Sequence, residues 1–491
     1  FLWGFCNGMI DVMDKHFQEE LHLTLSQSAW VQFAHYLGYF LMALPAGWLA
    51  GKLGYKGGII TGLLMVAAGG LWFIPATQIA MFWAFLLGVC FIAAGLTFLE
   101  TVANPYTTVL GPKQFAATRI NLAQSCNGIG WVFGPLAGAM FFYSTDAEGR
   151  NTGAETLWIP YAAVAIVVLI LAVVFLRAYL PDLKMSDDYN IDGDTPASPL
   201  PETAATTAAA ATTAAATASR SATTNGSLKT PLFLLWTNIV VLSAAVGMIA
   251  SAITSIFTSS DAVILNAFIC TAAALAIAGS VILATRSRRL THTSIWAHPH
   301  FSGATIAQFF YVAAQSGIFA YFINYMTSQP PVVLTNKTAA TLASIGFILF
   351  LSGRFIGAFL LKKFPPHRVL GLFGVCNIVL CLLVVLKLGW VSAICVFASY
   401  FFMSIMFPTI FALGIFGLGG KAKKASSFIV MAIMGGAIVP KVMGHVADHS
   451  DIARGFIVPL ACFGVVAAYG FMWKKLSRTE GAVSIGMTKG H

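Results

Sequence analysis

The chain has 491 residues, of which 58% are hydrophobic and 9% are charged, and its mean hydropathy is +0.81. A soluble domain carries about 25% charged residues, so this chain lacks the charge to cover a water-facing surface. Apolar runs of about 20 residues recur along its length, each long enough to cross a hydrocarbon core of ~30 Å. The composition predicts an all-α polytopic membrane protein and excludes a transmembrane barrel, whose strands alternate polar and apolar residues.

The net charge of +10 does not indicate nucleic-acid binding, because the basic residues stand in short clusters between the apolar runs. The eight cysteines all lie in apolar stretches and form no CxxC pair, so we expect buried thiols and no metal site. No nucleophile–base pair or metal-ligand spacing is visible in the sequence. We therefore expect neither an enzyme nor a bound cofactor.

Twelve core spans are predicted to form two bundles, one in each half of the chain. An N-terminal six-helix bundle occupies residues 1–184, and a C-terminal six-helix bundle occupies residues 291–476, followed by a cytoplasmic tail at 477–491. The spans are expected near residues 1–18, 28–51, 58–76, 80–108, 118–143, 157–180, 301–326, 338–361, 369–387, 390–417, 425–446 and 454–473.

An insertion separates the two predicted bundles. Residues 185–230 are rich in Ala, Thr and Ser and cannot bury a core, so we expect a disordered cytoplasmic linker there. Residues 231–290 contain two further apolar runs and end in a basic cluster. We expect them to cross the membrane out and back as an extra hairpin, which brings the expected spans to fourteen; the alternative is a hairpin that lies at the membrane interface.

The distribution of basic residues predicts which ends of the spans face the cytoplasm. Lysines and arginines cluster in every second loop, whereas the opposite loops carry only scattered basic residues, mostly beside acids. The positive-inside rule then places both termini in the cytoplasm, and we expect a location in the plasma membrane. Asn336 begins an N-glycosylation sequon, Asn336-Lys337-Thr338, which is expected in a short outer loop.

The two halves of the chain repeat one another in sequence. The segment 47–52 after the second span resembles the segment 357–362 after the eighth, and Asn104-Pro105 in the fourth span corresponds to Phe407-Pro408 in the tenth. This spacing predicts two parallel structural repeats. A loop with glycine and lysine between spans two and three resembles the hallmark of the major facilitator superfamily, in which we expect the cation to bind carbonyl groups at the end of a neighbouring helix.

Two acids within apolar runs predict a proton pathway through the membrane. Glu100 lies in the segment GLTFLETVANPY and Asp11 in FLWGFCNGMIDVMDK. A carboxylate at the centre of a spanning helix costs about 2.5–3.5 kcal/mol on insertion scales, so such a group is kept where it faces a cavity or a partner. We expect Asp11 and Glu100 to bind the coupling proton.

Carboxamides and phenols on neighbouring spans predict a sugar site. Amides can form bidentate hydrogen bonds with hydroxyl groups, and aromatic rings can stack on the apolar face of a sugar. The alternative is that these groups only bond helices together, which contributes about 0.6 kcal/mol per hydrogen bond on average. The candidate sugar-binding residues are Asn7, Asn104, Asn121, Gln124, Asn127, Gln308, Tyr311, Gln315, Asn324 and Tyr325.

For other lysine, arginine and histidine side chains within the spans, the sequence predicts a role less specifically. Lys441 lies in the apolar segment GGAIVPKVMG and is a possible partner that neutralises an acid in one conformation. Arg354 is expected to reach the interface or to bind carbonyl groups near the cytoplasmic end of its span. His35 and His445 are expected to be packed or interfacial rather than to relay protons.

With these residues in hand, the chain resembles the L-fucose/proton symporter family of the major facilitator superfamily, which includes glucose/galactose transporters. The resemblance covers nearly all of the chain outside residues 185–300, and its most specific motifs are LETVANP and NLAQ. It implies that Asp11 is the protonatable aspartate of the family, Glu100 its glutamate linked to substrate and proton, and Gln124 a glutamine of the cavity. Gly8 departs from the pattern, because the bacterial fucose transporter has a second asparagine there.

The sequence therefore predicts a proton-coupled monosaccharide symporter that works by alternating access. The substrate is expected to be a hexose or a 6-deoxyhexose, such as L-fucose, galactose or glucose, with protons as the coupling ion. We expect the protein to work as a monomer in the lipid bilayer. Two alternatives stay open from the residues: a sugar facilitator without proton coupling, and a sugar sensor that does not transport.

Overall fold

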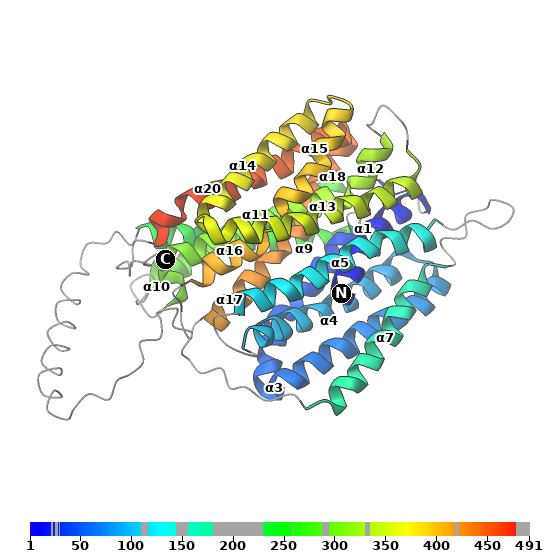
Figure 1. Cartoon of the computed structure of the whole chain (residues 1–491). Coiled ribbons are helices and arrows are strands. Elements are labelled where there is room, and N and C mark those ends of the chain that lie inside the picture. The colour runs from blue at the N-terminus through cyan, green and yellow to red at the C-terminus, as the bar shows by residue number, and fades with distance from the viewer. Residues whose placement is uncertain are drawn as a thin grey trace, which may run out of the picture.

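The structure is a computed structural model in which long helices lie side by side (Figure 1). It describes residues 1–20, 23–24, 28, 30–109, 116–143, 156–179, 229–258, 260–286, 294–328, 334–416, 418 and 422–477. Across these described ranges the chain is helical and contains no strand. The predicted linker at 185–230 and tail at 477–491 lie almost entirely outside the described residues.

The first half of the chain forms a bundle of helices α1, α3, α4, α5 and α7. Their bounds are Leu2–Glu20, Trp30–Ile79, Phe82–Val109, Ala116–Phe141 and Trp158–Arg177. The long α3 contains two helical segments that meet at Gly54, whose φ of 70° interrupts the helix. Glycine adopts this backbone conformation without the steric cost that a Cβ atom would add.

The loop at Gly54 contains the cation that the sequence pattern singles out. Lys56 Nζ donates hydrogen bonds of 2.9 Å to the carbonyl oxygens of Leu176 and Ala178. These carbonyls lie at the C-terminal end of α7 and have no helical partner of their own. The lysine therefore binds the carbonyl end of a neighbouring helix, as expected for this loop.

The second half forms a bundle in which several helices are broken. Its first helix bends by 43° between α11 and α12, at Tyr321. The helices are α11 (Pro299–Ala320), α12 (Phe322–Ser328), α13 (Asn336–Lys363), α14 (Pro366–Val385), α15 (Trp390–Met403), α16 (Met406–Ile415), α17 (Ala422–Met431), α18 (Gly435–His449), α19 (Ile452–Gly455) and α20 (Ile457–Ser477).

The predicted glycosylation residue lies at a helix start rather than in a loop. Asn336 is the first residue of α13, and Thr335 caps this helix by accepting a hydrogen bond from the Thr338 N–H at 3.3 Å. The Thr338 hydroxyl is itself 2.8 Å from the Thr335 hydroxyl. The cap starts the helix inside the sequon, because Thr335 satisfies a backbone donor that the first turn leaves free.

Two helices, α9 (Lys229–Phe257) and α10 (Asp261–Arg286), follow the predicted linker and pack against each other. Trp236 Nε1 donates to Ser280 Oγ at 3.0 Å between them. Helix α9 is attached to the second bundle: Asn238 donates to the Ser302 carbonyl at 3.0 Å and accepts from the Thr305 hydroxyl at 2.6 Å. None of the apolar segment of α10 is buried within the protein.

The described residues contain ten helices that are long and apolar enough to cross a membrane, or up to eleven if the bent pair α11–α12 is one span. Both helices of the hairpin are among the ten. Helices α1 and α5 and the part of α3 before Gly54 run beside them but do not meet this length-and-composition criterion. These three segments carry most of the polar residues of the first bundle. Whether all fourteen expected segments cross the membrane stays a prediction.

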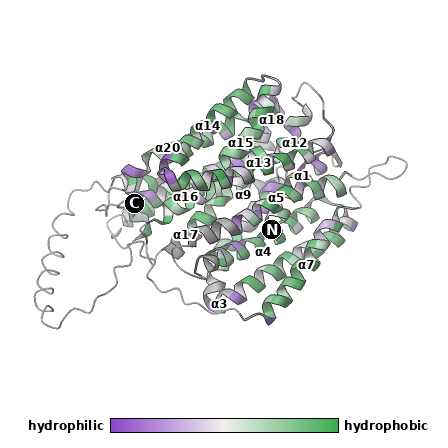
Figure 2. Ribbon diagram, viewed as in Figure 1, coloured by the Kyte–Doolittle hydropathy of each residue, from purple (hydrophilic) through white to green (hydrophobic). Residues whose placement is uncertain are grey.

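Apolar side chains cover the outside of the bundles as well as their interiors. Outer helices such as α7 and α14 are hydrophobic along most of their length (Figure 2). Large side chains on these helices, including Ile170, Leu176 and Leu372, are more than half exposed. Such a surface is suited to lipid rather than to water, in line with the composition.

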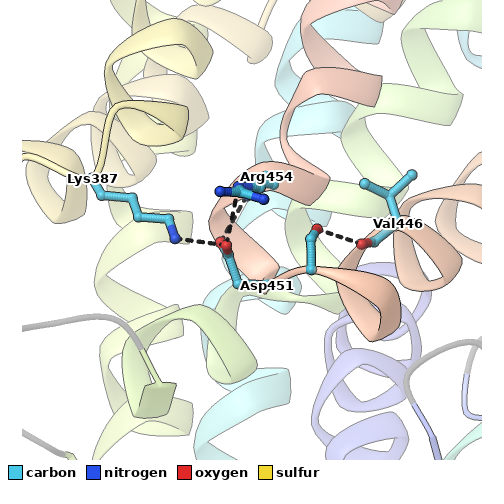
Figure 3. Close-up of polar contacts among 5 residues, drawn as sticks. Lys387, Val446, Asp451 and Arg454 are labelled. Carbon is cyan, nitrogen blue, oxygen red and sulfur yellow. Dashed lines mark hydrogen bonds and ion pairs between the residues drawn. The ribbon is translucent and has the colours of Figure 1, made fainter.

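At the predicted outer end, an ion-pair cluster joins the α14–α15 loop to the segment between α18 and α19. Lys387 Nζ lies 2.6 Å from Asp451 Oδ2, and the Arg454 backbone N–H donates to Asp451 Oδ1 at 3.0 Å (Figure 3). Arg454 Nε lies 3.5 Å from the same carboxylate. Burial alone would raise the pKa of Asp451, but the hydrogen bonds from Lys387 and Arg454 and their charges hold this pKa below its usual range.

Candidate functional site

The candidate site lies at the seam where the two bundles meet. Trp131 of α5 packs against Phe319 of α11 and Phe347 of α13, with ring centroids 5.6 Å and 4.9 Å apart. A cavity of about 10 Å³ lies beside these rings. It has room for about one water molecule. Its lining comes from both bundles and consists of Asn7, Ile10, Gln32, His35, Tyr36, Trp131, Ser316 and Phe319.

Glu100 belongs to a group of polar side chains inside the first bundle. Its Oε2 atom is inaccessible and has no hydrogen-bond partner. The Asn7 Oδ1 atom, the Tyr39 hydroxyl and the Trp3 Nε1 atom share this property. Tyr39 lies beside Asn7 and Trp3 and interacts electrostatically with Glu100, so the four side chains form one cluster, here called the Glu100 cluster. Buried polar groups without partners are rare and mark positions where a ligand, proton or water can bind.

Arg354 of α13 extends from the second bundle into the first. Its Nη1 atom donates to the Gln124 carbonyl at 2.8 Å and lies 3.3 Å from Gln124 Oε1. Its Nε atom donates to the Ser404 carbonyl at 3.3 Å within its own bundle. The guanidinium also interacts electrostatically with Glu100. Arg354 does bind carbonyl groups, as expected from the sequence, but one of them belongs to the opposite bundle.

Two of the predicted sugar-binding amides contact each other in the part of the seam that Arg354 reaches. Asn127 Nδ2 donates to Gln124 Oε1 at 3.1 Å. Gln124 Oε1 is thus shared by an amide of its own helix and a guanidinium of the other bundle. A sugar hydroxyl that binds Gln124 would have to replace one of these partners.

At the other end of the seam, Asn324 and Gln18 join the bundles, and Ser28 bonds Gln18. Gln18 of α1 donates to the Ser28 hydroxyl at 2.7 Å, and Asn324 of α12 donates to Gln18 Oε1 at 2.5 Å. Gln18, Ser28 and Asn324 are here called the outer gate, because the sequence predicts this end of the spans to face outward. The outer gate and the Arg354–Gln124 contact lie at opposite ends of the seam, so the conformation is closed at both.

The remaining predicted residues of α11 and α12 lie apart from this group. Tyr311 is fully buried and donates to the Met403 carbonyl at 2.9 Å, inside the second bundle. Gln308 is also fully buried, and neither side-chain polar atom has a partner. Gln315 is half-buried, and the Tyr325 ring packs against Phe456 at a centroid distance of 5.5 Å. In this conformation Tyr311 bonds one helix to another, which is the alternative role considered for such residues.

The positions of Lys441 and of three further predicted site residues remain to be described. The Lys441 ammonium lies 4.1 Å from the centroid of the Trp30 ring, across the seam, and this cation–π contact replaces the acid partner considered for it. Asp11, Asn104 and Asn121 lie on α1, α4 and α5, and their side chains fall outside the described part of the structure.

Sequence reasoning passed over three residues that the structure brings to the seam or the outer gate. Tyr39 and Trp131 look like ordinary core aromatics in an apolar run. Asp14 stands next to a lysine near the end of a span, a context typical of an exposed interface residue. For Asp14 the sequence contains a usable signal. Polar residues recur every three or four positions along one face of α1, namely Asn7, Asp11, Asp14 and Gln18.

Comparisons with known proteins agree with this architecture. A family model of the major facilitator superfamily matches residues 1–297. The chain is 32% identical to the L-fucose-proton symporter of Escherichia coli K12, with 95% of this chain and 89% of that protein covered. It is 26% identical to a glucose/galactose transporter of Brucella abortus, with 97% and 92% covered. The solved structure of the E. coli fucose:proton symporter in the outward conformation has 30% identity, a TM-score of 0.60 and 96% coverage of both chains.

The chain therefore belongs to the major facilitator superfamily. Within that superfamily it is a member of the L-fucose/proton symporter family, so the resemblance carried by its motifs is confirmed.

Proposed function

We propose that the protein is a proton-coupled monosaccharide symporter that works by alternating access. The observation that carries this proposal is the seam itself. A protonatable carboxyl, Glu100, is linked electrostatically to a cation of the opposite bundle, Arg354, which also binds the amide residue Gln124. The names of the relatives, an L-fucose-proton symporter and a glucose/galactose transporter, support the same substrate class and coupling ion.

Proton binding at Glu100 would change the electrostatics of the seam. An ionised carboxylate in a water-poor environment costs several kcal/mol unless an opposite charge or hydrogen bonds compensate it. Arg354 supplies such a charge only while the bundles are close together at its end of the seam. Protonation removes the need for that partner, so the neutral form of Glu100 lets Arg354 and the second bundle move away from it.

Sugar binding would use the amides and rings that face the seam. Gln124 and Asn127 can form paired hydrogen bonds with vicinal hydroxyls, and Trp131 offers a flat apolar face. The cavity of about 10 Å³ is far too small for a hexose. Binding therefore requires the bundles to separate at one end, which is the rocking motion expected of parallel repeats around a central site.

The orientation and assembly follow from the same proposal. With both termini in the cytoplasm, the outer gate faces the acidic side of a plasma membrane and the Arg354–Gln124 contact faces the cytoplasm. A monomer is sufficient, because both bundles of one chain line the seam. Protons are the coupling ion, and no cofactor takes part.

The experiment that tests the proposal is a panel of hexoses and 6-deoxyhexoses added to proteoliposomes with a pH dye inside. We expect L-fucose, D-galactose or D-glucose to enter and to acidify the lumen. Uptake without acidification would indicate a facilitator, and binding without uptake would indicate a sensor; either result would contradict the proposal.

A further inference from the structure

Asp14 is a buried carboxyl that the proposed proton pathway does not use. It lies on α1, its side chain is 0% exposed, and within the described residues no group meets hydrogen-bond geometry with either carboxylate oxygen, although Ser28 and Gln18 lie beside it. An ionised carboxylate without water, counter-ion or hydrogen bonds is costly, and the usual outcome is that the group binds a proton. In the closed conformation burial therefore shifts Asp14 toward its neutral form.

The carboxyl lies directly beside the outer gate. Gln18 follows it by one helical turn on the same face of α1, and Ser28 also faces it. These two neutral side chains bond each other at 2.7 Å, and Asn324 of the other bundle donates to Gln18 Oε1 at 2.5 Å. Separation of Asn324 from Gln18 would open this end of the seam and admit water to Asp14.

Within the described residues, few charged or titratable groups surround this position. Lys15 is the next residue of α1 and interacts electrostatically with Asp14. Tyr321, at the break between α11 and α12, does so too and is also affected by Asp448 of α18. The Tyr321 hydroxyl is occupied, because it donates to the Pro440 carbonyl at 3.0 Å.

Two further titratable residues of α1, Asp11 and His16, flank Asp14. Asp11 lies one turn earlier, and its side chain is outside the described residues. His16 is buried against the rings of Phe142 and Tyr143, with centroids 6.0 Å away in both cases. The structure thus places neutral groups, rather than a dedicated cation, on the gate side of the Asp14 carboxyl.

We propose that Asp14 is a proton-binding residue of the outer gate, which holds its proton while Gln18 and Asn324 join the bundles and releases it when the gate opens. This inference rests on the proposed transport cycle, since it gives the gate a role in it. Proton release and gate opening are then linked, so each favours the other. An acidic exterior protonates Asp14 and favours closure behind a bound sugar, which is the direction an importer needs.

The test measures gate opening directly, without sugar. Spin labels at Thr24 and Lys337, both exposed and on opposite bundles at this end, report the gate distance after Cys126 and Cys270 are replaced by serine. Asp11→Asn and Glu100→Gln remove the proposed coupling acids from the background. In this background Asp14 is the acid whose proton release is tested. Over the pH range in which it releases its proton, we expect the ratio of open to closed gates to rise about tenfold for each pH unit.

Adding Asp14→Asn should abolish the pH dependence and keep the gate mostly closed, because the amide imitates the neutral acid. Asp14→Leu serves as a second variant should the amide impair folding, and it should abolish the pH dependence as well. Asp448→Asn, at an exposed carboxyl on α18, is the matched control and should leave the response intact. A pH response that survives removal of Asp14, or no response before its removal, would overturn the inference. Failure of sugar uptake would count against the proposed function only, because the distance measurement needs no sugar.

Discussion

At the scale of single residues, Glu100 and Arg354 come from different bundles and interact across the seam, while Gln124 binds the guanidinium. This arrangement assigns separate tasks to residues of similar polarity. Glu100 can change its charge, Arg354 stays charged at every physiological pH, and Gln124 and Asn127 are permanently neutral. Among these four residues, Glu100 can serve coupling because it titrates, and the neutral amides can serve recognition.

Replacing Glu100 by glutamine should separate coupling from transport. The amide imitates the protonated acid, so Glu100→Gln should lose uphill uptake driven by a pH gradient while it keeps sugar-for-sugar exchange. Counterflow and gradient-driven uptake in the same proteoliposomes check this expectation. Asp448→Asn should retain both activities. Full uphill accumulation by Glu100→Gln would show that this carboxyl is not required for coupling.

Gln124→Ala should weaken sugar binding by about 1–3 kcal/mol, because a sugar hydroxyl then lacks its partner. Tyr311→Phe is the matched comparison: the Tyr311 hydroxyl bonds the Met403 carbonyl inside the second bundle. Its loss should lower the stability of the protein by about 1 kcal/mol and leave sugar affinity unchanged. Isothermal titration and thermal unfolding of both variants separate the two roles. Equal sugar affinities in Gln124→Ala and the wild type would favour the view that these amides only join helices.

At the scale of elements, short polar contacts fix the positions of loops and of the hairpin. Lys387 has a φ of 55°, which is unusual for a residue with a side chain, and its ammonium is held by Asp451. Asn238 performs a comparable task for α9 through its bonds to Ser302 and Thr305. In both cases a few hydrogen bonds help to position the segment, and α9 also packs Ala245, Val241 and Ile249 into an apolar cluster with the bundles.

The Asp451 cluster predicts a dependence of stability on pH. The folded-state pKa of Asp451 is lower than its unfolded value, so its contribution is fully present above the unfolded pKa and is lost as pH falls through the folded pKa. Asp451→Asn should lower stability at pH 7 by about 0.5–1 kcal/mol, since the pair is partly exposed. Apparent melting temperatures from pH 3 to 7 check this. A difference that grows toward low pH would contradict the assignment.

Removing residues 185–290 and rejoining the bundles through a flexible linker of similar reach should leave sugar affinity within a few-fold. The lining of the seam cavity includes no residue of α9 or α10. The loss of the Asn238 bonds and of the buried Ala245 should reduce thermal stability or surface expression instead. Asn238→Ala, which keeps the hairpin but weakens its attachment, should show a smaller effect of the same kind. A purified, folded deletion protein that binds no sugar would refute the view that the twelve-helix core is self-sufficient.

The sequence revealed the helices and the family more fully than the site. Apolar runs and the motifs LETVANP and NLAQ depend on local pattern, and these predict the fold and the family correctly. The Arg354–Gln124 contact and the Glu100–Tyr39 interaction join residues far apart in the chain, and their geometry follows only from how two helices face each other. Asp14 shows the same limit, because tertiary packing buries it completely and its position beside Lys15 does not predict this.

At the scale of the whole molecule, the two bundles meet at both ends of one seam, through the outer gate and through Arg354 and Gln124. Within the described residues, hydrogen bonds join the bundles at each end, and the contact at one end can break while the other persists. The aromatic contacts of Trp131 between them can serve as the surface on which the bundles rock. This closed form and the outward form of the solved fucose:proton symporter are two states expected of one alternating-access cycle.

Uphill transport driven by protons tests the central claim most directly. Proteoliposomes with a neutral lumen are placed in an acidic buffer with radiolabelled sugar at equal concentrations on both sides. We expect the sugar to accumulate inside above the external concentration and to return to equality when a protonophore collapses the gradient. Sugar that only equilibrates, with no response to the pH gradient or the protonophore, would contradict proton-coupled symport.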